Sequence, residues 1–256
     1  MRLLVKIGGT LLERPDTRQA LAAQAAELAR RGDRITIVHG GGKRLSRRLE
    51  REGVVSQFLG GLRVTPPEIM EMVVEVFAGH VNHTLVAELQ RAGARAVGLS
   101  GIDAGLIEAV QLSPELGAVG EVVRTDASLL DLLTENGFVP AVACIAGGAD
   151  GAIFNVNADQ MAAALAGGFQ ADRVIFLTDV AGVLDSSQRL IHKLSAAEAE
   201  NLIAEGTARG GMEAKLRAAL KALAAGASEV SILGGDAPDA LLSLLAGSPS
   251  GTTVHL

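Results

Sequence analysis

Short apolar runs alternate with helix-like segments along most of the chain. The Ala- and Leu-rich segment 16–31, for example, follows an apolar run at the N-terminus and ends at Gly32. Strands that alternate with helices are typical of a largely parallel sheet flanked by helices. We therefore predict an α/β fold. The expected strands are 2–7, 34–38, 94–99, 138–145, 174–177 and 229–233, with further extended segments at 106–112 and 118–124.

A long apolar helix is expected after Thr65. In Thr65-Pro66-Pro67-Glu68, the threonine is suited to cap a helix, with proline at the first helical position and glutamate three residues after the cap. The helix then extends toward Arg91, well beyond the roughly 11 residues of an average helix. Its apolar positions cover more than one stripe, so it is either buried within the chain or packed against a second subunit in a homodimer. Ser195-Ala196-Ala197-Glu198 predicts a second capping box.

Composition excludes several classes of protein. The 256 residues include 48% hydrophobic residues, enough for a large core, but only 2% aromatic residues and no Trp or Tyr. Scarce aromatic side chains and a net charge of −6 argue against binding of single-stranded nucleic acid and of duplex DNA. No apolar stretch approaches the roughly 18 to 20 residues of a membrane span, and the N-terminus resembles a strand rather than a targeting peptide. The expected compartment is cytoplasmic.

Cysteine and histidine give no sign of a metal centre. The single cysteine, Cys144, excludes an internal disulfide and a cysteine-based zinc site. It lies in the apolar sequence Val142-Ala143-Cys144-Ile145, which favours a buried strand residue over a nucleophile. His80 and His83 are three residues apart but lack a third ligand nearby. The arginine-rich segment after Gly42 is interpreted as a solvated helix face, with an anion site as the alternative; its arginines are Arg44, Arg47, Arg48 and Arg51.

Lysines and glycine turns mark the candidate chemistry. Lys6 lies at the end of the first strand and is soon followed by Gly8-Gly9, and the second strand leads into Gly40-Gly41-Gly42. Such turns expose backbone N–H groups, and a nearby cation adds the charge that suits the phosphates of a nucleotide. Lys215 follows the glycine pair Gly210-Gly211. Because the pattern Gly-x4-Gly-Lys-Ser/Thr is absent, these features indicate phosphoryl transfer without a P-loop.

Asp159 is the acidic residue that we expect to act with these lysines. It comes two residues after Asn157 and could order the lysines or the water shell of Mg²⁺. Each feature also has a structural interpretation: a strand lysine can reach solvent, a triple glycine can simply turn the chain, and the segment 155–159 can cap the next helix. Taken together, the lysines, the glycine turns and the carboxylate favour phosphoryl transfer.

Six motifs give the chain a resemblance to the amino acid kinase family. They are Lys6-Ile7-Gly8-Gly9, Val38–Gly42, Gly61–Thr65, Asn155–Gln160, Leu177–Leu184 and Gly211-Met212-x-x-Lys215, in family order over nearly the whole chain. The resemblance implies a three-layer αβα sandwich around a mainly parallel sheet. It also implies an N-terminal lobe, residues 1–150, for an acyl amino acid and for dimerisation, and a C-terminal lobe, residues 151–256, for ATP. The glycine-rich stretch at 145–155 marks the expected cut.

The resemblance implies a role for each motif residue. Lys6 and Lys215 match two lysines that stabilise the transition state, and Asp159 matches the aspartate that holds both. The residues matched to the acyl amino acid are Gly41, Gly42, Arg63 and Asn155, of which Arg63 and Asn155 would receive its α-carboxylate. The residues matched to the nucleotide are Gly8, Gly9, Asp179, Val180, Ala181, Gly182, Val183, Leu184, Thr207, Ala208 and Arg209. Mg²⁺ would be carried by ATP, without direct protein ligands.

Within the family, the motifs are most similar to the branch that phosphorylates the γ-carboxylate of N-acetyl-L-glutamate with ATP, in arginine biosynthesis. A γ-carboxyl group in water ordinarily has a pKa of about 4.3 and is ionised at neutral pH, so this reaction needs no general base. The alternatives are a kinase for carrier-protein-linked aminoadipate or glutamate, and a non-catalytic nucleotide or amino-acid sensor on the same fold. The presence of both lysines and Asp159 favours the enzyme.

The resemblance also bears on assembly. Relatives that arginine inhibits carry an additional N-terminal helix, which links dimers into a hexameric ring, whereas this chain starts directly at the first strand. We therefore expect a homodimer whose activity responds weakly or not at all to arginine.

Overall fold

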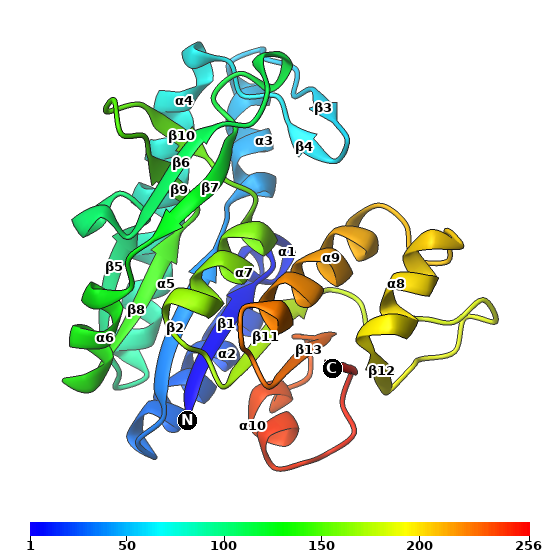
Figure 1. Ribbon diagram of the computed structural model, residues 1–256. Coiled ribbons are helices and arrows are strands. Elements are labelled where there is room, and N and C mark those ends of the chain that lie inside the picture. Colours follow the sequence, from blue (N-terminus) through cyan, green and yellow to red (C-terminus); the bar gives the residue numbers. More distant parts are fainter.

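The computed structural model describes residues 1–256, and an eight-stranded sheet forms its centre (Figure 1). The strand order is β12-β14-β13-β11-β1-β2-β8-β5, and every neighbouring pair is parallel except β13 and β14. The mainly parallel sheet predicted from the strand–helix alternation is thus confirmed. The strands are β1 (Arg2–Ile7), β2 (Arg34–His39), β5 (Arg95–Ser100), β8 (Phe138–Ala143), β11 (Arg173–Thr178), β12 (Lys193–Ser195), β13 (Glu229–Gly234) and β14 (Thr252–His255).

Helices cover both faces of this sheet and make the predicted three-layer sandwich. In Figure 1, α7 and α9 lie in front of the sheet, and α2 and α5 lie behind it. The helices are α1 (Gly9–Glu13), α2 (Pro15–Arg30), α3 (Gly42–Arg51), α4 (Pro67–Val74), α5 (Asn82–Arg91), α6 (Ser128–Glu135), α7 (Ala158–Gly168), α8 (Ala196–Ala204), α9 (Gly211–Ala224) and α10 (Ala240–Leu245). A π-helical segment, η1 (Glu75–Val81), joins α4 to α5, and two 3₁₀ turns are η2 (Asp103–Gly105) and η3 (Pro114–Leu116). None of these helices combines the length and the apolar composition that a membrane span requires.

The core is built from aliphatic side chains on both sides of the sheet. Leu3, Leu4 and Val5 of β1 are at most 1% exposed, as are Val174 and Ile175 of β11. Parallel strands covered by helices on both faces are expected to be apolar without alternation, which is the pattern that these runs have in the sequence. The backbone at the end of β1 is therefore held rigidly, and it fixes the position from which a side chain there extends.

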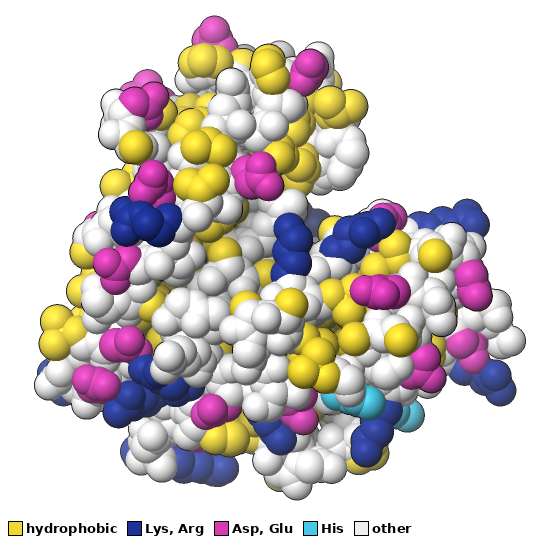
Figure 2. Space-filling view, viewed as in Figure 1, with side chains coloured by type: hydrophobic (Ala, Val, Ile, Leu, Met, Phe, Trp, Pro, Cys, Tyr) yellow, Lys and Arg dark blue, Asp and Glu magenta, His cyan; other side chains and the backbone are white.

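Two smaller sheets lie at one end of the molecule. The four-stranded sheet has the order β10-β9-β6-β7, and a short hairpin joins β3 to β4. Their bounds are β10 (Ile153–Asn155), β9 (Ile145–Gly147), β6 (Ile107–Gln111), β7 (Gly120–Thr125), β3 (Phe58–Leu59) and β4 (Leu62–Arg63). Figure 2 shows a hollow between the part that carries this hairpin and the part that carries α8 and α9, with Lys and Arg side chains along its edge.

The glycine-rich stretch at 145–155 is a hairpin of the small sheet. Strands β9 and β10 pair in antiparallel fashion, with Ile145 opposite Asn155. The strand β8, expected to run through 145, ends at Ala143, so Cys144 lies between two strands. The division into lobes at residue 150, with separate ligands, stays a prediction.

The long helix after Thr65 exists, but it begins one residue later than predicted, and its middle segment, η1, is π-helical rather than α-helical. Pro66, not Thr65, is the residue that precedes the first turn, and no side chain caps it. Thr65 is fully buried, and its hydroxyl instead donates to the Arg63 carbonyl at 2.9 Å. The backbone here is still paired with the neighbouring loop, since the N–H of Thr65 donates to the carbonyl of Leu116. By contrast, the capping box at Ser195 is confirmed.

Candidate active site

Two lysines and one aspartate from three elements meet in the centre of the molecule. Asp159, in the first turn of α7, places Oδ1 2.7 Å from Nζ of Lys6 on β1 and Oδ2 3.3 Å from Nζ of Lys215 on α9. All three side chains are buried or nearly so, with exposed fractions of 9%, 8% and 15% for Lys6, Asp159 and Lys215. The carboxylate thus holds both ammonium groups, as the resemblance implied.

The environment of Asp159 keeps this cluster charged. Burial by itself would raise the pKa of the carboxyl, but the charges and hydrogen bonds of Lys6 and Lys215 outweigh it and hold the pKa below its usual value. Asn157 caps α7, because its side-chain oxygen accepts the N–H groups of Asp159 and Gln160 at 2.9 and 3.2 Å. Two lysines around one aspartate leave a net positive charge that faces the cleft. An anion with several oxygens is the natural ligand for such a site.

The first two glycine turns lie side by side because their strands are neighbours in the sheet. Ile7 pairs with His39, and a methyl group added to Gly9 would lie 3.9 Å from the backbone nitrogen of Gly42. Gly9 begins α1 and Gly42 begins α3, so first-turn N–H groups without intrahelical partners meet at this edge. The N–H of Gly8 is already taken, since it donates to the carbonyl of Leu177 at 2.8 Å.

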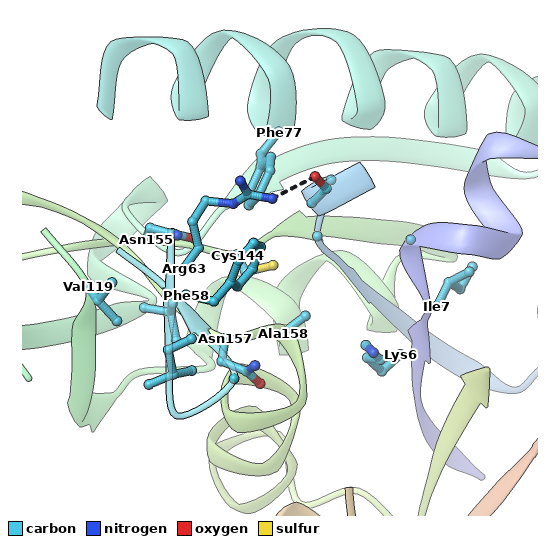
Figure 3. A pocket seen from close by; sticks show the side chains of 17 residues that line it. Lys6, Ile7, Phe58, Arg63, Phe77, Val119, Cys144, Asn155, Asn157 and Ala158 are labelled. Atoms are coloured by element: carbon cyan, nitrogen blue, oxygen red, sulfur yellow. Dashed lines mark hydrogen bonds between the residues drawn. The ribbon is translucent and has the colours of Figure 1, made fainter. Parts of the chain in front are cut away.

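A cavity of about 210 Å³ opens between these turns and the small sheet. Figure 3 shows Lys6 on one side of the cavity and Arg63 with Asn155 on the other. Gly40, Gly41, Gly42, Phe58, Phe77 and Cys144 also line it. The cavity therefore joins the residues predicted for the acyl amino acid to one of the two lysines.

Arg63 is a buried guanidinium without a carboxylate partner. It is 9% exposed, and its Nη2 donates to the carbonyl of Gly42 at 2.9 Å and to Ser46 Oγ at 2.7 Å. Its Nη1 donates to Ser56, and the ring of Phe58 covers the group with its centroid 4.7 Å from Cζ. Burial lowers the pKa of Arg63, although a guanidinium remains charged at neutral pH. A buried cation that is held in place in this way is preorganised to bind an anionic ligand.

Asn155 lies at the end of β10 next to Arg63. Its side-chain nitrogen donates to the hydroxyl of Thr65 at 3.0 Å, and Thr65 is bound in turn to the carbonyl of Arg63. The segment around Thr65 thus connects the two predicted α-carboxylate residues, rather than starting the helix.

A larger cleft, of about 720 Å³, opens on the other side of Asp159. It is lined by Asp159, Gln160, Lys215, Arg217 and Lys221, together with the β3–β4 hairpin. A third cavity of about 340 Å³ contains Asp179, Val180 and Ala181 of the predicted nucleotide loop. Its other walls include Gly234 and Gly251.

The remaining predicted nucleotide residues line none of these three openings. Gly182, Val183 and Leu184 continue the loop after β11, and the segment from Thr207 to Arg209 connects α8 to α9. Arg209 uses its Nε to bind the carbonyl of Gly206. None of the three cavities includes Thr207, Ala208 or Arg209.

Several residues in or beside the cavity were not predicted from the sequence. Phe77 faces Gly41 from the long helix, and Ser46 and Ser56 hold Arg63. No motif marks these residues, since their contacts depend on how α3, β4 and the long helix pack. Cys144 was expected to be buried, and burial raises the pKa of its thiol to about 12, so it stays a thiol.

Comparisons with known proteins agree with this geometry. The model of the family described as "Amino acid kinase family" matches residues 1–234. An acetylglutamate kinase of Solibacter usitatus is 57% identical over 98% of both chains, and one of Rhizobium leguminosarum bv. trifolii is 41% identical over 94% of this chain and 86% of its own. The crystal structure of smu.665 from Streptococcus mutans UA159 has a TM-score of 0.87 at 28% identity and covers 99% of this chain and 98% of its own. The chain belongs to the amino acid kinase family.

Proposed function

We propose that the protein phosphorylates the γ-carboxylate of N-acetyl-L-glutamate with ATP and releases N-acetyl-L-glutamyl 5-phosphate, the second step of arginine biosynthesis. Two relatives with 57% and 41% identity, each aligned over most of both chains, are acetylglutamate kinases. The observation that carries the proposal is the buried cluster of Lys6, Asp159 and Lys215 beside a cavity that ends at Arg63.

The amino acid would bind in the cavity of about 210 Å³. The guanidinium of Arg63 and the amide of Asn155 are suited to its α-carboxylate, since both offer N–H donors at one side of the cavity. The γ-carboxylate would then lie at the turn of Gly41 and Gly42, where the start of α3 supplies N–H groups. This placement would direct a carboxylate oxygen toward Lys6, which lines the same cavity.

Charge compensation and alignment would supply the catalysis. The γ-carboxylate attacks the γ-phosphorus of ATP and the bond to the β,γ-bridging oxygen breaks, so that ADP leaves without any proton transfer. Negative charge grows on the phosphoryl oxygens and on the leaving group, and Lys6 and Lys215 are positioned to neutralise it. Asp159 keeps both lysines in place. The N–H groups at Gly9 would add to the stabilisation.

As a kinase, the protein uses ATP, and the rest of the nucleotide would contact Asp179–Leu184 and Thr207–Arg209. Mg²⁺ is part of the proposal as a companion of the ATP phosphates. Nowhere in the structure do three or more His, Cys, Asp or Glu side chains come together in a way that could hold a metal ion. Asp159, the acidic residue nearest the reacting groups, is engaged by two lysines. These residues therefore fit an ion that arrives on the nucleotide rather than one held by the protein.

We further propose a cytoplasmic homodimer that binds no nucleic acid. The support for a dimer is an apolar groove of about 690 Å³ along the long helix, lined by Met70, Val74, Ala78 and Ile153 among others. A groove of this kind is suited to an identical helix from a second copy related by a twofold axis. The net charge of −6 disfavours nucleic acid.

An ADP-release assay with several acceptors tests the reaction. We expect release that depends on N-acetyl-L-glutamate and is much slower with glutamate or carbamate. Activity only with a carrier-protein-linked glutamate or aminoadipate would overturn the choice of substrate. Nucleotide binding without turnover of any acceptor would indicate the sensor instead.

A further inference from the structure

Two side chains of the long helix contact the glycine turn at separate points. A methyl group placed on Gly41 would lie 2.6 Å from Cδ1 of Phe77, so the ring of Phe77 packs directly on the backbone of the turn. Five residues later, the amide of Asn82 reaches His39, which immediately precedes Gly40. The turn is thus held from the same helix at its middle and at its base.

The imidazole of His39 connects Asn82 to the turn. Its Nδ1 lies 2.9 Å from the carbonyl of Gly40, so this nitrogen donates, and Nε2 accepts from the Asn82 amide at 2.9 Å. The ring is completely buried, and burial lowers its pKa to about 4. Both nitrogens therefore have partners in the neutral form, and a proton on Nε2 would meet another donor.

Asn82 is held as firmly as the ring that it contacts. Its amide also donates to the carbonyl of Ala141 at 2.8 Å, and the side chain is 2% exposed. Gly98 on β5 makes room for it, because a methyl group at that position would lie 2.1 Å from Asn82 Oδ1. Neither His39 nor Asn82 lines the cavity proposed for the acceptor.

The π-helical segment explains how one helix makes both contacts. In an α-helix, a step of five residues turns about 140° around the axis, which would point Phe77 and Asn82 in different directions. Here the N–H of Asn82 donates to the carbonyl of Phe77, a hydrogen bond that spans five residues and brings them toward one face. The irregular turn closes on the very two residues that contact the glycine turn.

We infer that His39 and Asn82, with Phe77, are positioning residues of the reaction, and that the π turn in η1 exists to set them against the Gly40–Gly42 turn. The inference rests on the proposed function, because that turn is where the γ-carboxylate of the acceptor would bind. A turn that drifted by about 1 Å would misalign the nucleophile with the phosphorus, at a large cost in rate.

The variant Asn82→Ala tests the inference against Gln24→Ala as a matched control. Gln24 is another buried amide, 3% exposed, which donates to the carbonyl of Pro238 at 2.8 Å and accepts from the Leu241 N–H at 2.8 Å, away from the turn. We expect Asn82→Ala to raise KM for N-acetyl-L-glutamate about tenfold or more, with KM for ATP changed less than about twofold. Gln24→Ala should lose stability but keep both KM values.

The rate of backbone amide hydrogen exchange is a second measurement, which needs no substrate. The amide of Leu45 donates to the carbonyl of Gly41 at 2.9 Å, so exchange in the peptide that contains Leu45 reports on the turn. It should accelerate in Asn82→Ala and not in Gln24→Ala, whatever acceptor the enzyme uses. If Asn82→Ala does not fold, Phe77→Leu should accelerate exchange in the same peptide; exchange without substrate is the deciding measurement for this variant, because Phe77 itself lines the cavity.

A double-mutant cycle then tests whether the pair acts as a unit. His39→Asn should add little to the increase in KM caused by Asn82→Ala, because both variants break the same hydrogen-bonded link between the long helix and the glycine turn. Unchanged KM and unchanged exchange at Leu45 in folded Asn82→Ala or Phe77→Leu would overturn the inference. A wild-type enzyme that is inactive on N-acetyl-L-glutamate would refute the proposed function instead, and the exchange result would still decide on positioning.

Discussion

The carboxylate of Asp159 neutralises only one of the two ammonium groups that it contacts, which leaves charge for the substrate. We predict that Lys6→Met and Lys215→Met each lower kcat by on the order of 10² to 10³, because each removes one charge that stabilises the transition state. The other lysine still partners Asp159, so the thermal unfolding temperature should change little. Steady-state kinetics at saturating substrate measure the effect.

Lys193→Met is a suitable control for these variants, since Lys193 is exposed on the edge strand β12 and lines none of the three cavities. Near-normal kcat in both lysine variants would remove them from the mechanism.

Arg63 is a second residue whose chemistry can be tested by a small change. Arg63→Lys keeps the charge but loses the planar group that binds Ser46, Ser56 and the face of Phe58. We predict an increase in KM for N-acetyl-L-glutamate of about tenfold to 100-fold, with a much smaller change for ATP. Arg95→Lys is the matched control, because Arg95 also stacks on an aromatic ring, that of Phe138, with its Cζ 3.9 Å from the centroid. The reverse pattern, with ATP binding weakened, would place Arg63 in the other half of the site.

His39 predicts a pH dependence of stability. Its pKa is about 4 in the folded protein and near 6.5 when unfolded, so between these values the unfolded state binds more protons. Stability should therefore fall as the pH drops from about 6.5 to 4, by on the order of 3 kcal/mol from this group. Urea unfolding of the wild type and of His39→Gln across this range measures the difference. Parallel curves for the two proteins would contradict the prediction.

At the scale of elements, the contact between the glycine turn and the long helix limits what the turn can accept. Gly41→Ala places a methyl group against Phe77, and since the ring is buried the turn must shift. We predict a loss of stability of about 1 to 3 kcal/mol together with a raised KM for the acyl amino acid. Gly147→Ala is the control, because the added methyl group would meet only Ile102, at 3.9 Å. Equal behaviour of the two variants would show that the turn tolerates displacement.

The start of the long helix shows how local and tertiary preferences compete. The sequence from Thr65 to Glu68 has every feature of a capped helix, and yet Thr65 binds Arg63 and Asn155. The Thr65 hydroxyl can make only a few hydrogen bonds. Its bonds to the residues around the cavity take the place of a bond to the N-terminus of the helix. Ser195, in a surface segment without such partners, forms the capping box that its sequence predicts.

At the scale of the whole molecule, the apolar groove along α4 and η1 predicts the dimer. Val74→Arg introduces a bulky, charged side chain into that groove, where it would disturb the apolar packing of the twofold contact even beside Glu71 and Glu75. Light scattering should give the mass of a dimer for the wild type and of a monomer for Val74→Arg. Leu132→Arg, on the exposed side of α6 where Leu132 is 60% exposed, should remain a dimer. A monomeric wild type would show that the groove has another use.

The sequence alone determined the elements and the identity of the chemical groups. Strands such as 2–7 follow from unbroken apolar runs, because burial on both faces of a parallel sheet imposes that pattern locally. The glycine turns, the lysines and the family motifs are likewise local, and the family comparison confirms the class of enzyme that they indicated.

Only the tertiary structure decided how these groups meet. Asp159 and Lys215 are 56 residues apart, and the sequence indicated their contact only through the family resemblance, because no periodicity records that one carboxylate holds lysines from β1 and α9. The π turn, the stacking of Phe77 on Gly41 and the pair of His39 with Asn82 were also beyond prediction. Each is a contact between distant segments, whose energy depends on packing and on the burial of polar groups rather than on the preferences of neighbouring residues.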